Sequence, residues 1–244
     1  MIILSMKTKS KIAVIIPCFK VKSKILKVVK MCLECFDYIV CVDDKCPENS
    51  GLYIQNNFKK NKKIKVIFHK KNKGVGGAVK SGFQFLLNKN YKYIIKLDGD
   101  GQMNPYEYIN LINPMKDKTI SYTKGNRFLD LNYFSKSPKI RFYGNLILTY
   151  VSKFTIGNFK MSDPLNGYIC IKKNILKNFN FSNIRDDFFF ETSMLFELKR
   201  INAKTEDVRV DINYGGEISN FELKSEFFRF IYLHIIYFVK RISL

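Results

Sequence analysis

Several signals that usually classify a chain are missing from this sequence. It has no Walker lysine motif and no complete G-x-G-x-x-G fingerprint, so it carries neither of these glycine-rich signatures for nucleotide phosphates. Its longest apolar run is too short to cross a bilayer, and no internal repeat or low-complexity linker divides the chain. The 244 residues therefore make one large domain or two small ones, long enough to bury a sizeable core.

A cleavable secretion signal is also missing. The apolar run from Met1 to Leu4 is too short for one, and Lys7, Lys9 and Lys11 follow it directly. Because nothing directs the chain to an oxidising compartment, we expect its six cysteines to be reduced and the protein to be cytoplasmic.

A zinc site is the alternative for four of these cysteines. Cys32 and Cys35 form a C-x-x-C motif, and Cys41 and Cys46 are near them in the sequence. However, Cys32 and Cys35 lie on a helical apolar pattern and Cys41 lies inside an apolar strand. We therefore expect buried thiols that serve the core.

Acidic residues and arginine are scarce. The chain has 42 lysines and arginines against 21 acidic residues, a net charge of +21, and only seven of its residues are arginine. Such an excess predicts an anionic partner: a nucleotide or phosphate substrate, an acidic membrane face or nucleic acid. An AT-rich coding sequence, which favours lysine, explains part of the excess. The 46% hydrophobic and 15% aromatic content indicates a globular protein.

What is present is an alternation of strands and helices. We expect strands at 11–17, 38–42, 63–68, 93–97, 119–123, 168–171 and 204–212. Helices are expected at 23–35, from 52 to about 60, at 75–87, between Pro105 and Pro114, and at 142–154 and 188–198. This order predicts an α/β fold with a mostly parallel central sheet and helices on both faces.

The ends of the predicted strands carry polar residues. Ligands of such sheets bind beyond the carboxyl ends of the strands. Pro17 closes the first strand, Asp43 and Asp44 follow the second, and Asp98 and Asp100 follow the fourth. Their convergence on one edge predicts a ligand site there.

The strongest local signal is the stretch 93–105, in which Asp98, Asp100 and Gln102 are separated by glycines. Two carboxylates at the end of a buried strand form a hard oxygen site that suits Mg²⁺ or Mn²⁺. The alternative is an ordinary acidic turn, since Asp and Gly are common in loops.

Two further features suit phosphate groups. Gly74-Val-Gly-Gly opens a helix, so its backbone N–H groups are candidates to face a phosphate or a sugar, although a cap or close packing explains these glycines equally well. Arg127 and Arg141 suit bidentate phosphate contacts, with plain surface charge as the alternative.

Glu191 is an isolated acid in the apolar helix 188–198. If it is buried it needs a partner, for which Arg185 and Lys199 are the nearest candidates along the chain. It is otherwise a candidate functional carboxylate.

The last segment, 224–244, is aromatic and aliphatic and ends with Lys240 and Arg241. Its thirteen-residue apolar core at 227–239 would span only ~20 Å as a helix, short of the ~30 Å hydrocarbon layer. This composition predicts an amphipathic helix lying in an anionic membrane interface. A helix packed on the domain or on a second subunit is the alternative, and a lone His234 is more often a packed residue than a ligand.

Taken together and in this order, the motifs resemble those of the inverting family 2 glycosyltransferases of GT-A fold, in particular the polyprenyl-phosphate (dolichol-phosphate) sugar transferases. The resemblance covers about residues 11–220. The motifs are Val14-Ile-Ile-Pro-Cys-Phe, Val42-Asp-Asp, Asn72-Lys-Gly-Val-Gly-Gly-Ala, Asp98-Gly-Asp-Gly-Gln, Gly125-Asn-Arg-Phe, Asp163-Pro-Leu-Asn-Gly, Phe190-Glu and Tyr214-Gly-Gly-Glu-Ile-Ser-Asn.

The resemblance implies roles for single residues. Pro17 and Phe19 would border the nucleotide, and Asp44, with Asp43 beside it, would hold the base or ribose. The donor site would be lined by Lys73 and Gly76. Metal and diphosphate would be bound by Asp98, Asp100 and Gln102. Phosphates of the donor or the acceptor would be contacted by Arg127 and Arg141. One departure is that Lys20 and Lys22 follow Phe19 where the family usually has an acidic residue, which affects the nucleotide preference.

The resemblance, together with the composition of the last segment, predicts a division of the chain. Residues 1–220 would form the catalytic domain, with 11–115 as the nucleotide-sugar-binding half and 116–220 as the acceptor-side half. Residues 221–244 would form the membrane-interface helix, which places the enzyme peripherally on the cytoplasmic face of a membrane.

The expected reaction is metal-dependent transfer from a UDP- or GDP-linked sugar. Asp100, Arg127, Arg141 and Glu191 are the candidate catalytic residues. A polyprenyl-phosphate acceptor is already an anion, whereas a hydroxyl of a cell-envelope glycan would need a base, with Glu191 first and Asp163 next. A non-catalytic nucleic-acid or membrane-binding module and a nucleotidyltransferase are remote alternatives, and we expect no nucleic-acid partner.

Overall fold

The computed structural model describes residues 11–158, 163–211 and 223–243. It contains one seven-stranded sheet in the order β3-β2-β1-β4-β6-β5-β7. The strands are β1 (Ile12–Cys18), β2 (Tyr38–Asp43), β3 (Ile64–Phe68), β4 (Tyr93–Lys96), β5 (Ile120–Asn126), β6 (Ile169–Lys172) and β7 (Lys204–Arg209). β6 runs antiparallel between β4 and β5, and the other pairings are parallel. The predicted α/β fold with a mostly parallel sheet is confirmed.

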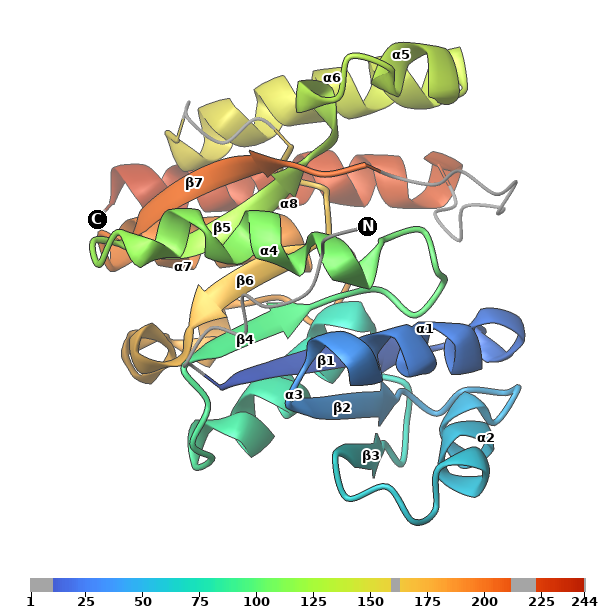
Figure 1. Ribbon diagram of the computed structural model, residues 1–244. Helices are drawn as coiled ribbons and strands as arrows, with labels where there is room; N and C mark the ends of the chain where they lie inside the picture. The colour runs from blue at the N-terminus through green and yellow to red at the C-terminus, as the bar shows by residue number, and fades with distance from the viewer. Residues whose placement is uncertain (1–10, 159–162, 212–222, 244) are drawn as a thin grey trace.

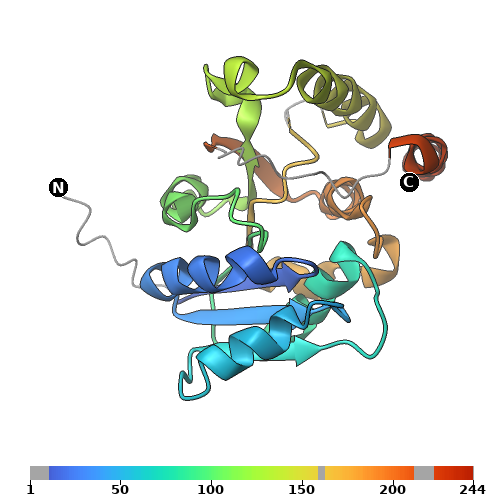
Figure 2. The same ribbon diagram turned by 90° about the vertical axis from the view of Figure 1, so that its right-hand side faces the viewer.

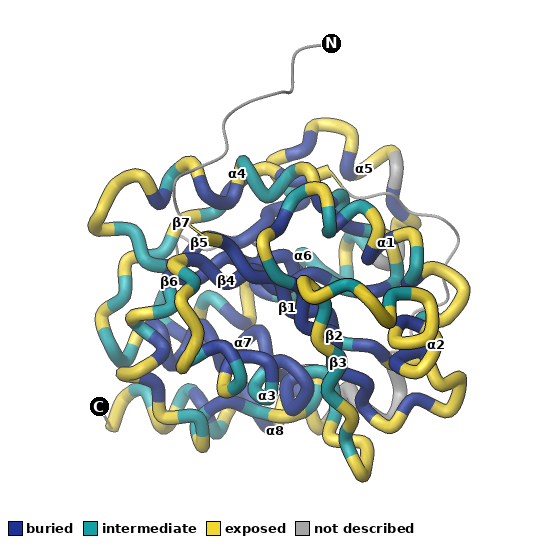
Figure 3. Tube along the Cα trace, turned by 60° about the horizontal axis from the view of Figure 1, so that its bottom comes forward, coloured by how far each residue is buried: buried dark blue, intermediate teal, exposed yellow. Residues whose placement is uncertain are grey.

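Helices cover both faces of the sheet (Figure 1). They are α1 (Lys22–Cys35), α2 (Ser50–Asn57), α3 (Val75–Leu87), α4 (Tyr108–Ile112), α5 (Tyr133–Lys136), α6 (Lys139–Ile156), α7 (Phe190–Arg200) and α8 (Leu223–Ile242). One apolar core joins α1, α2 and α4 to one face of the strands, and a second joins α3 and α7 to the other. The strands form the buried centre between these layers (Figure 3).

A further layer lies outside α7. α6 and α8 run side by side beyond it, at the side of the molecule away from β3 (Figures 1 and 2). Phe189 and Phe196 pack there against Phe230, Leu233 and Tyr237 of α8. One face of α8 is therefore committed to the protein, in agreement with the packed-helix alternative, while the opposite face is open.

Pro17 does not close β1, as the sequence suggested. The strand continues to Cys18, with Pro17 opposite Val42 in β2. The carbonyl of Ile15 accepts from Leu97 N–H after β4, and that of Cys18 accepts from Asp44 N–H after β2. The backbone N–H and C=O groups of residues 15 and 17 face the same neighbouring strand, which is β4. The N–H that proline lacks would therefore face β4, and the β1–β2 ladder loses no hydrogen bond.

Two other expectations concern segment boundaries. Gly125 and Asn126 belong to β5, so this strand extends beyond the predicted range 119–123 and includes the start of the Gly125-Asn-Arg-Phe motif. The Tyr214 motif lies outside the described residues. Strands from both predicted halves, 11–115 and 116–220, share the one sheet.

Candidate active site

The loop after β4 presents Asp98 and Asp100 at the carboxyl edge of the sheet. Both are partly exposed, whereas Leu97 before them and Gly99 between them are buried. Gly101 turns the chain at φ +78°, a conformation that favours glycine, and Gln102 N–H donates to Asp100 Oδ1 at 3.0 Å. The loop thus holds two carboxylates beside a carboxamide, a set of hard oxygen donors that fits Mg²⁺ or Mn²⁺.

The described residues form no closed metal cage around this loop. Within the described residues, no group of three or more His, Cys, Asp or Glu side chains is arranged to hold a metal ion. A hard cation prefers about six oxygen ligands. An ion at Asp98 and Asp100 would therefore draw most of its ligands from water or a bound substrate.

Lys96 is a site residue that the sequence reasoning missed. It lies in β4 with only 1% of its side chain exposed, and its Nζ lies 2.8 Å from Asp98 Oδ1 and 3.2 Å from Glu191 Oε1. Burial lowers its pKa, but the two carboxylates outweigh burial and the net pKa is raised. Lys96 therefore carries a charge throughout the physiological range. A lysine inside the apolar run Tyr93 to Leu97 was the available signal.

Glu191 is buried, and its partner is Lys96. The side chain is 11% exposed, and neither Arg185 nor Lys199, the partners expected from the sequence, pairs with it: Arg185 bonds Asp187. Since Glu191 Oε1 and Asp98 Oδ1 share one ammonium group, α7 brings Glu191 to the edge of the sheet where Asp98 lies.

A second buried lysine lies in the same row of the sheet. Ile169 of β6 is opposite Lys96 on one side and Lys124 of β5 on the other. Lys124 Nζ donates to the Asn166 carbonyl, and burial lowers its pKa to about 8 despite the nearby Glu191. The buried polar groups around Lys96 and Lys124 form a polar network under the site, on either side of Ile169.

The loop 163–167 lies over this network. A Cβ on Gly167 would overlap Lys96 Nζ and come 2.6 Å from Asp98 Oδ2, so only glycine permits this close approach. At the other end of the loop, Asp163 accepts from Arg127 Nε at 2.6 Å, Nη2 at 2.7 Å and backbone N–H at 3.0 Å.

This ion pair affects the roles predicted for Arg127 and Asp163. Arg127 and Asp163 are both buried, and Asp163 is used as a structural partner, so it is not available as the second candidate base. Arg141 lies in α6, and its side chain is outside the described part of the structure.

Asp43 and Asp44 lie at the same edge, but their carboxylates bond internally. Asp43 accepts from Cys46 N–H at 2.8 Å and Gly51 N–H at 2.6 Å. Asp44 accepts from Lys73 N–H at 2.9 Å and Gly74 N–H at 2.7 Å, and His69 Nδ1 lies 2.6 Å from its Oδ1.

Two N–H groups of the glycine loop, which one interpretation of the sequence assigned to a phosphate, are used inside the protein instead. Gly74 N–H is used by Asp44, and Gly77 N–H donates to the Asp186 carbonyl at 3.1 Å. A Cβ on Gly76 would overlap the Arg185 carbonyl oxygen, so this glycine is explained by close packing of α3 against the segment before α7. Close packing, the alternative interpretation of these glycines, therefore applies at Gly76, and the contact of Gly76 with the donor stays a prediction.

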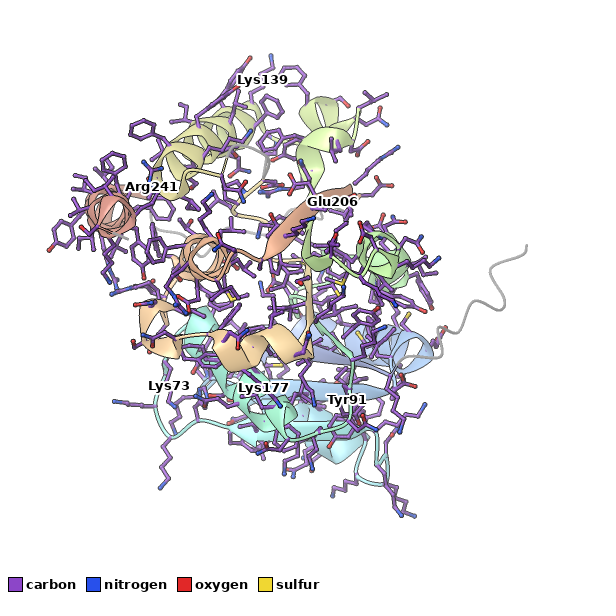
Figure 4. All side chains as sticks on the ribbon, turned by 90° about the vertical axis from the view of Figure 1, so that its left-hand side faces the viewer. Lys73, Tyr91, Lys139, Lys177, Glu206 and Arg241 are labelled. Atoms are coloured by element: carbon purple, nitrogen blue, oxygen red, sulfur yellow. The ribbon has the colours of Figure 1, made fainter. Side chains whose placement is uncertain are left out.

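The remaining predicted donor residues lie on the surface of this edge. Phe19, just after β1, is 36% exposed. Lys73 extends from the loop before α3 at the outer surface (Figure 4), and borders a cavity of about 350 Å³ with Lys80, Arg185 and Arg229. The edge thus combines an acidic loop with basic side chains nearby.

The cysteines are free, as expected, and five of the six are buried, with Cys35 half-buried. Burial raises the pKa of Cys32, and it raises that of Cys35 to about 12. Cys32 and Cys41 lie in the apolar core and Cys35 packs against it, so the zinc alternative receives no support.

The model of the family described as "Glycosyl transferase family 2" matches residues 13–179, about two thirds of the chain. The chain belongs to this family. The matched segment runs from β1 through β6 and includes the Asp98 loop, Arg127 and Asp163. The protein is thus a glycosyltransferase of GT-A fold.

Two relatives and one solved structure are among the proteins similar to this chain. An uncharacterised protein of Methanocaldococcus jannaschii is 27% identical over 234 residues, 90% of this chain and 98% of that one. A UDP-N-acetylglucosamine–dolichyl-phosphate N-acetylglucosaminyltransferase of Methanococcus voltae is 30% identical over 115 residues, 47% of this chain and 45% of that one. Glucosyl-3-phosphoglycerate synthase of Mycobacterium tuberculosis, in complex with UDP, superposes with a TM-score of 0.70 at 13% identity, over 95% of this chain and 81% of that chain.

Proposed function

We propose that this enzyme transfers a sugar, with inversion, from a nucleotide-diphosphate donor to a polyprenyl phosphate at a membrane surface. The observation that carries the proposal is the partly exposed pair Asp98 and Asp100 at the carboxyl edge of the sheet. The Methanococcus voltae relative is named for a UDP-sugar donor and a dolichyl-phosphate acceptor. The structural neighbour has also been solved with Mn²⁺ and UDP, at a TM-score of 0.63 and 12% identity.

In this proposal each residue at the carboxyl edge of the sheet has a separate role. Asp98, Asp100 and Gln102 hold the Mg²⁺ or Mn²⁺ ion, which when bound neutralises charge on the departing diphosphate. Pro17 and Phe19 border the nucleotide, and Lys73 adds positive charge near the phosphates. Asp44 acts indirectly, because its carboxylate fixes the backbone of Lys73 and Gly74.

The acceptor is assigned from the state of Glu191. A phosphate acceptor is already an anion and needs no strong base. Glu191 Oε1 is engaged by Lys96 at 3.2 Å, which favours such an acceptor. The second candidate is a sugar hydroxyl of an envelope glycan with Glu191 as the base, and the position of Glu191 beside Asp98 favours it.

The proposed membrane surface consists of the outer faces of α6 and α8. Exposed apolar residues recur along both helices at helical spacing: Tyr143, Ile147, Tyr150, Val151 and Phe154 on α6, and Ile231, Tyr232, Ile235, Val239 and Ile242 on α8. Phe154 and Phe238 stack at 5.1 Å and join the two helices. Lys139 and Arg241 mark basic positions at the ends of this layer (Figure 4).

Such a surface suits an anionic interface, in which apolar side chains enter the lipid and basic ones meet head groups. In the described part of the chain, no helix is long and apolar enough to cross a membrane. The sequence had assigned this role to 221–244 alone; α6 is the second contributor in this proposal, and the side is taken to be the cytoplasmic one.

The proposal predicts activity with defined substrates. With Mn²⁺ and a panel of UDP- and GDP-linked sugars, we expect one donor to yield a glycosyl phosphate lipid only when polyprenyl phosphate is present, detected by mass spectrometry. Transfer to an oligosaccharide hydroxyl in place of the lipid phosphate would favour the second candidate. Release of pyrophosphate, or no turnover of any sugar nucleotide, would contradict the proposal.

The membrane surface is tested separately by vesicle sedimentation. The double change Tyr232→Ser and Ile235→Ser removes two exposed apolar side chains, each worth roughly 1.5–3 kcal/mol when buried. We therefore expect at least ~10-fold weaker binding to vesicles containing anionic lipid. The control is Leu52→Ser with Tyr53→Ser on α2, an exposed apolar pair on another side of the protein, 46% and 38% exposed against 62% and 57% for Tyr232 and Ile235. Equal partitioning of both double variants would exclude α8 from the membrane surface.

A further inference from the structure

Lys96 lies where it can act on the candidate metal site without touching solvent. Its side chain is 1% exposed, and its Nζ lies 2.8 Å from Asp98 Oδ1. Gly167 packs so closely over this ion pair that even a Cβ there would overlap Nζ. The ammonium group therefore lies in a buried, closely packed position beside Asp98.

We infer that Lys96 is a positioning residue that serves as a resident counter-cation of Asp98 and makes metal binding depend on the donor diphosphate. The inference rests on the proposed metal site. Asp98 Oδ1 already accepts from Lys96, so this carboxylate has only part of its capacity left for a metal ion. A divalent ion at Asp98 would also lie close to a fixed positive charge, which repels it.

The donor relieves both difficulties. Its diphosphate brings negative charge and further oxygen ligands to a site where the described residues provide no cage of three ligating side chains. Metal and nucleotide should then increase each other's affinity, and by linkage the two increases are equal.

Glu191 sets the strength of this effect. It shares the ammonium group at 3.2 Å and offsets part of its charge. Loss of Lys96 and loss of the Glu191 charge should therefore change metal affinity in opposite directions. A purely structural role for the pair would weaken the site in both cases.

The test is Mn²⁺ binding to the whole chain without nucleotide, measured by electron paramagnetic resonance of the free ion. We expect Lys96→Met to bind Mn²⁺ about tenfold more tightly than wild type and Glu191→Gln to bind it several-fold more weakly. Lys96→Arg keeps the charge and should not show the tighter Mn²⁺ binding of Lys96→Met. In the presence of UDP or GDP, whichever binds, the gain in Mn²⁺ affinity caused by the nucleotide should fall about tenfold in Lys96→Met.

Lys172→Met is the matched control. Lys172 is a buried lysine of β6 whose Nζ donates only to the carbonyls of Asp117 and Lys118 among the described contacts, so its loss should not change Mn²⁺ affinity. Glu191→Gln has nearly the same shape as wild type, so it decides the sign of the effect even if Lys96→Met does not fold. Weaker or unchanged Mn²⁺ binding in Lys96→Met, or unchanged binding in Glu191→Gln, would overturn the inference. An Asp100→Ala variant that binds Mn²⁺ like wild type would instead contradict the metal site itself.

Discussion

An Asp100→Ala variant is expected to lose sugar transfer by at least ~10²-fold while it keeps its fold. Asp100 is partly exposed in the loop after β4, and its Oδ1 accepts from the nearby Gln102 N–H at 3.0 Å. Truncation therefore removes an oxygen ligand from the proposed metal site and little packing. Because the departing diphosphate carries the charge that the ion neutralises, the loss should appear mainly in kcat.

The measurement is initial rate with the donor identified by the screen, alongside a thermal melt. The control is Asp117→Asn, an exposed acid before β5 whose carboxylate accepts from Thr119, which should stay within about twofold of wild type. Full activity of Asp100→Ala at an unchanged melting temperature would remove Asp100 from the reaction and leave the Asp98 loop as an acidic turn.

The layout of the donor edge could be predicted because it depends on local patterns. α3 begins and ends at Val75 and Leu87, where its apolar periodicity placed it. β4 ends one residue before the predicted end, which delivers Asp98 and Asp100 to the carboxyl edge as expected. Short-range hydrophobic spacing fixes these elements, and the parallel crossover rule fixes their direction.

The partners of the polar residues could not be predicted, since each lies far away in the sequence. Glu191 was compared with charges on its own segment, yet its partner is 95 residues away on β4. Asp44 and the glycine loop each looked available for a ligand, but they bond each other across 29 and 30 residues. Spacing shows that a buried polar group needs a partner, and only the tertiary fold shows which one it has.

The position of the antiparallel strand β6 in the sheet could not be predicted from the sequence either. The chain leaves β5 through α5 and α6 and returns between β4 and β5, so the row Lys96, Ile169 and Lys124 forms from three separate segments. No local pattern marks β6 as the strand that enters the middle of the sheet. Its insertion nevertheless creates the buried polar network, because it brings Asn166 and Gly167 onto the two lysines.

Asp163→Ala is expected to cause the largest loss of stability among the variants considered, about 3–5 kcal/mol. Asp163 is completely buried and accepts three N–H groups of Arg127, including both bonds of a bidentate pair at 2.6 and 2.7 Å. Its removal deprives the buried Arg127 guanidinium of the Asp163 charge and of these bonds, and it frees the loop that packs over Lys96. For a domain of this size the melting temperature should fall on the order of 10 °C.

The matched control is Asp211→Ala, which breaks the exposed Arg209–Asp211 pair at 3.4 Å, where more than half of each side chain is exposed. Since solvent screens that pair, its loss should change the melting temperature by less than about 2 °C. The double variant Arg127→Met with Asp163→Leu removes both charges and should recover part of the stability lost in Asp163→Ala, because no unpaired charge remains buried. A small effect of Asp163→Ala, comparable to that of Asp211→Ala, would mean that the pair does not hold the 163–167 loop. In that case Arg127 would be free to serve the phosphate contact that its motif predicted.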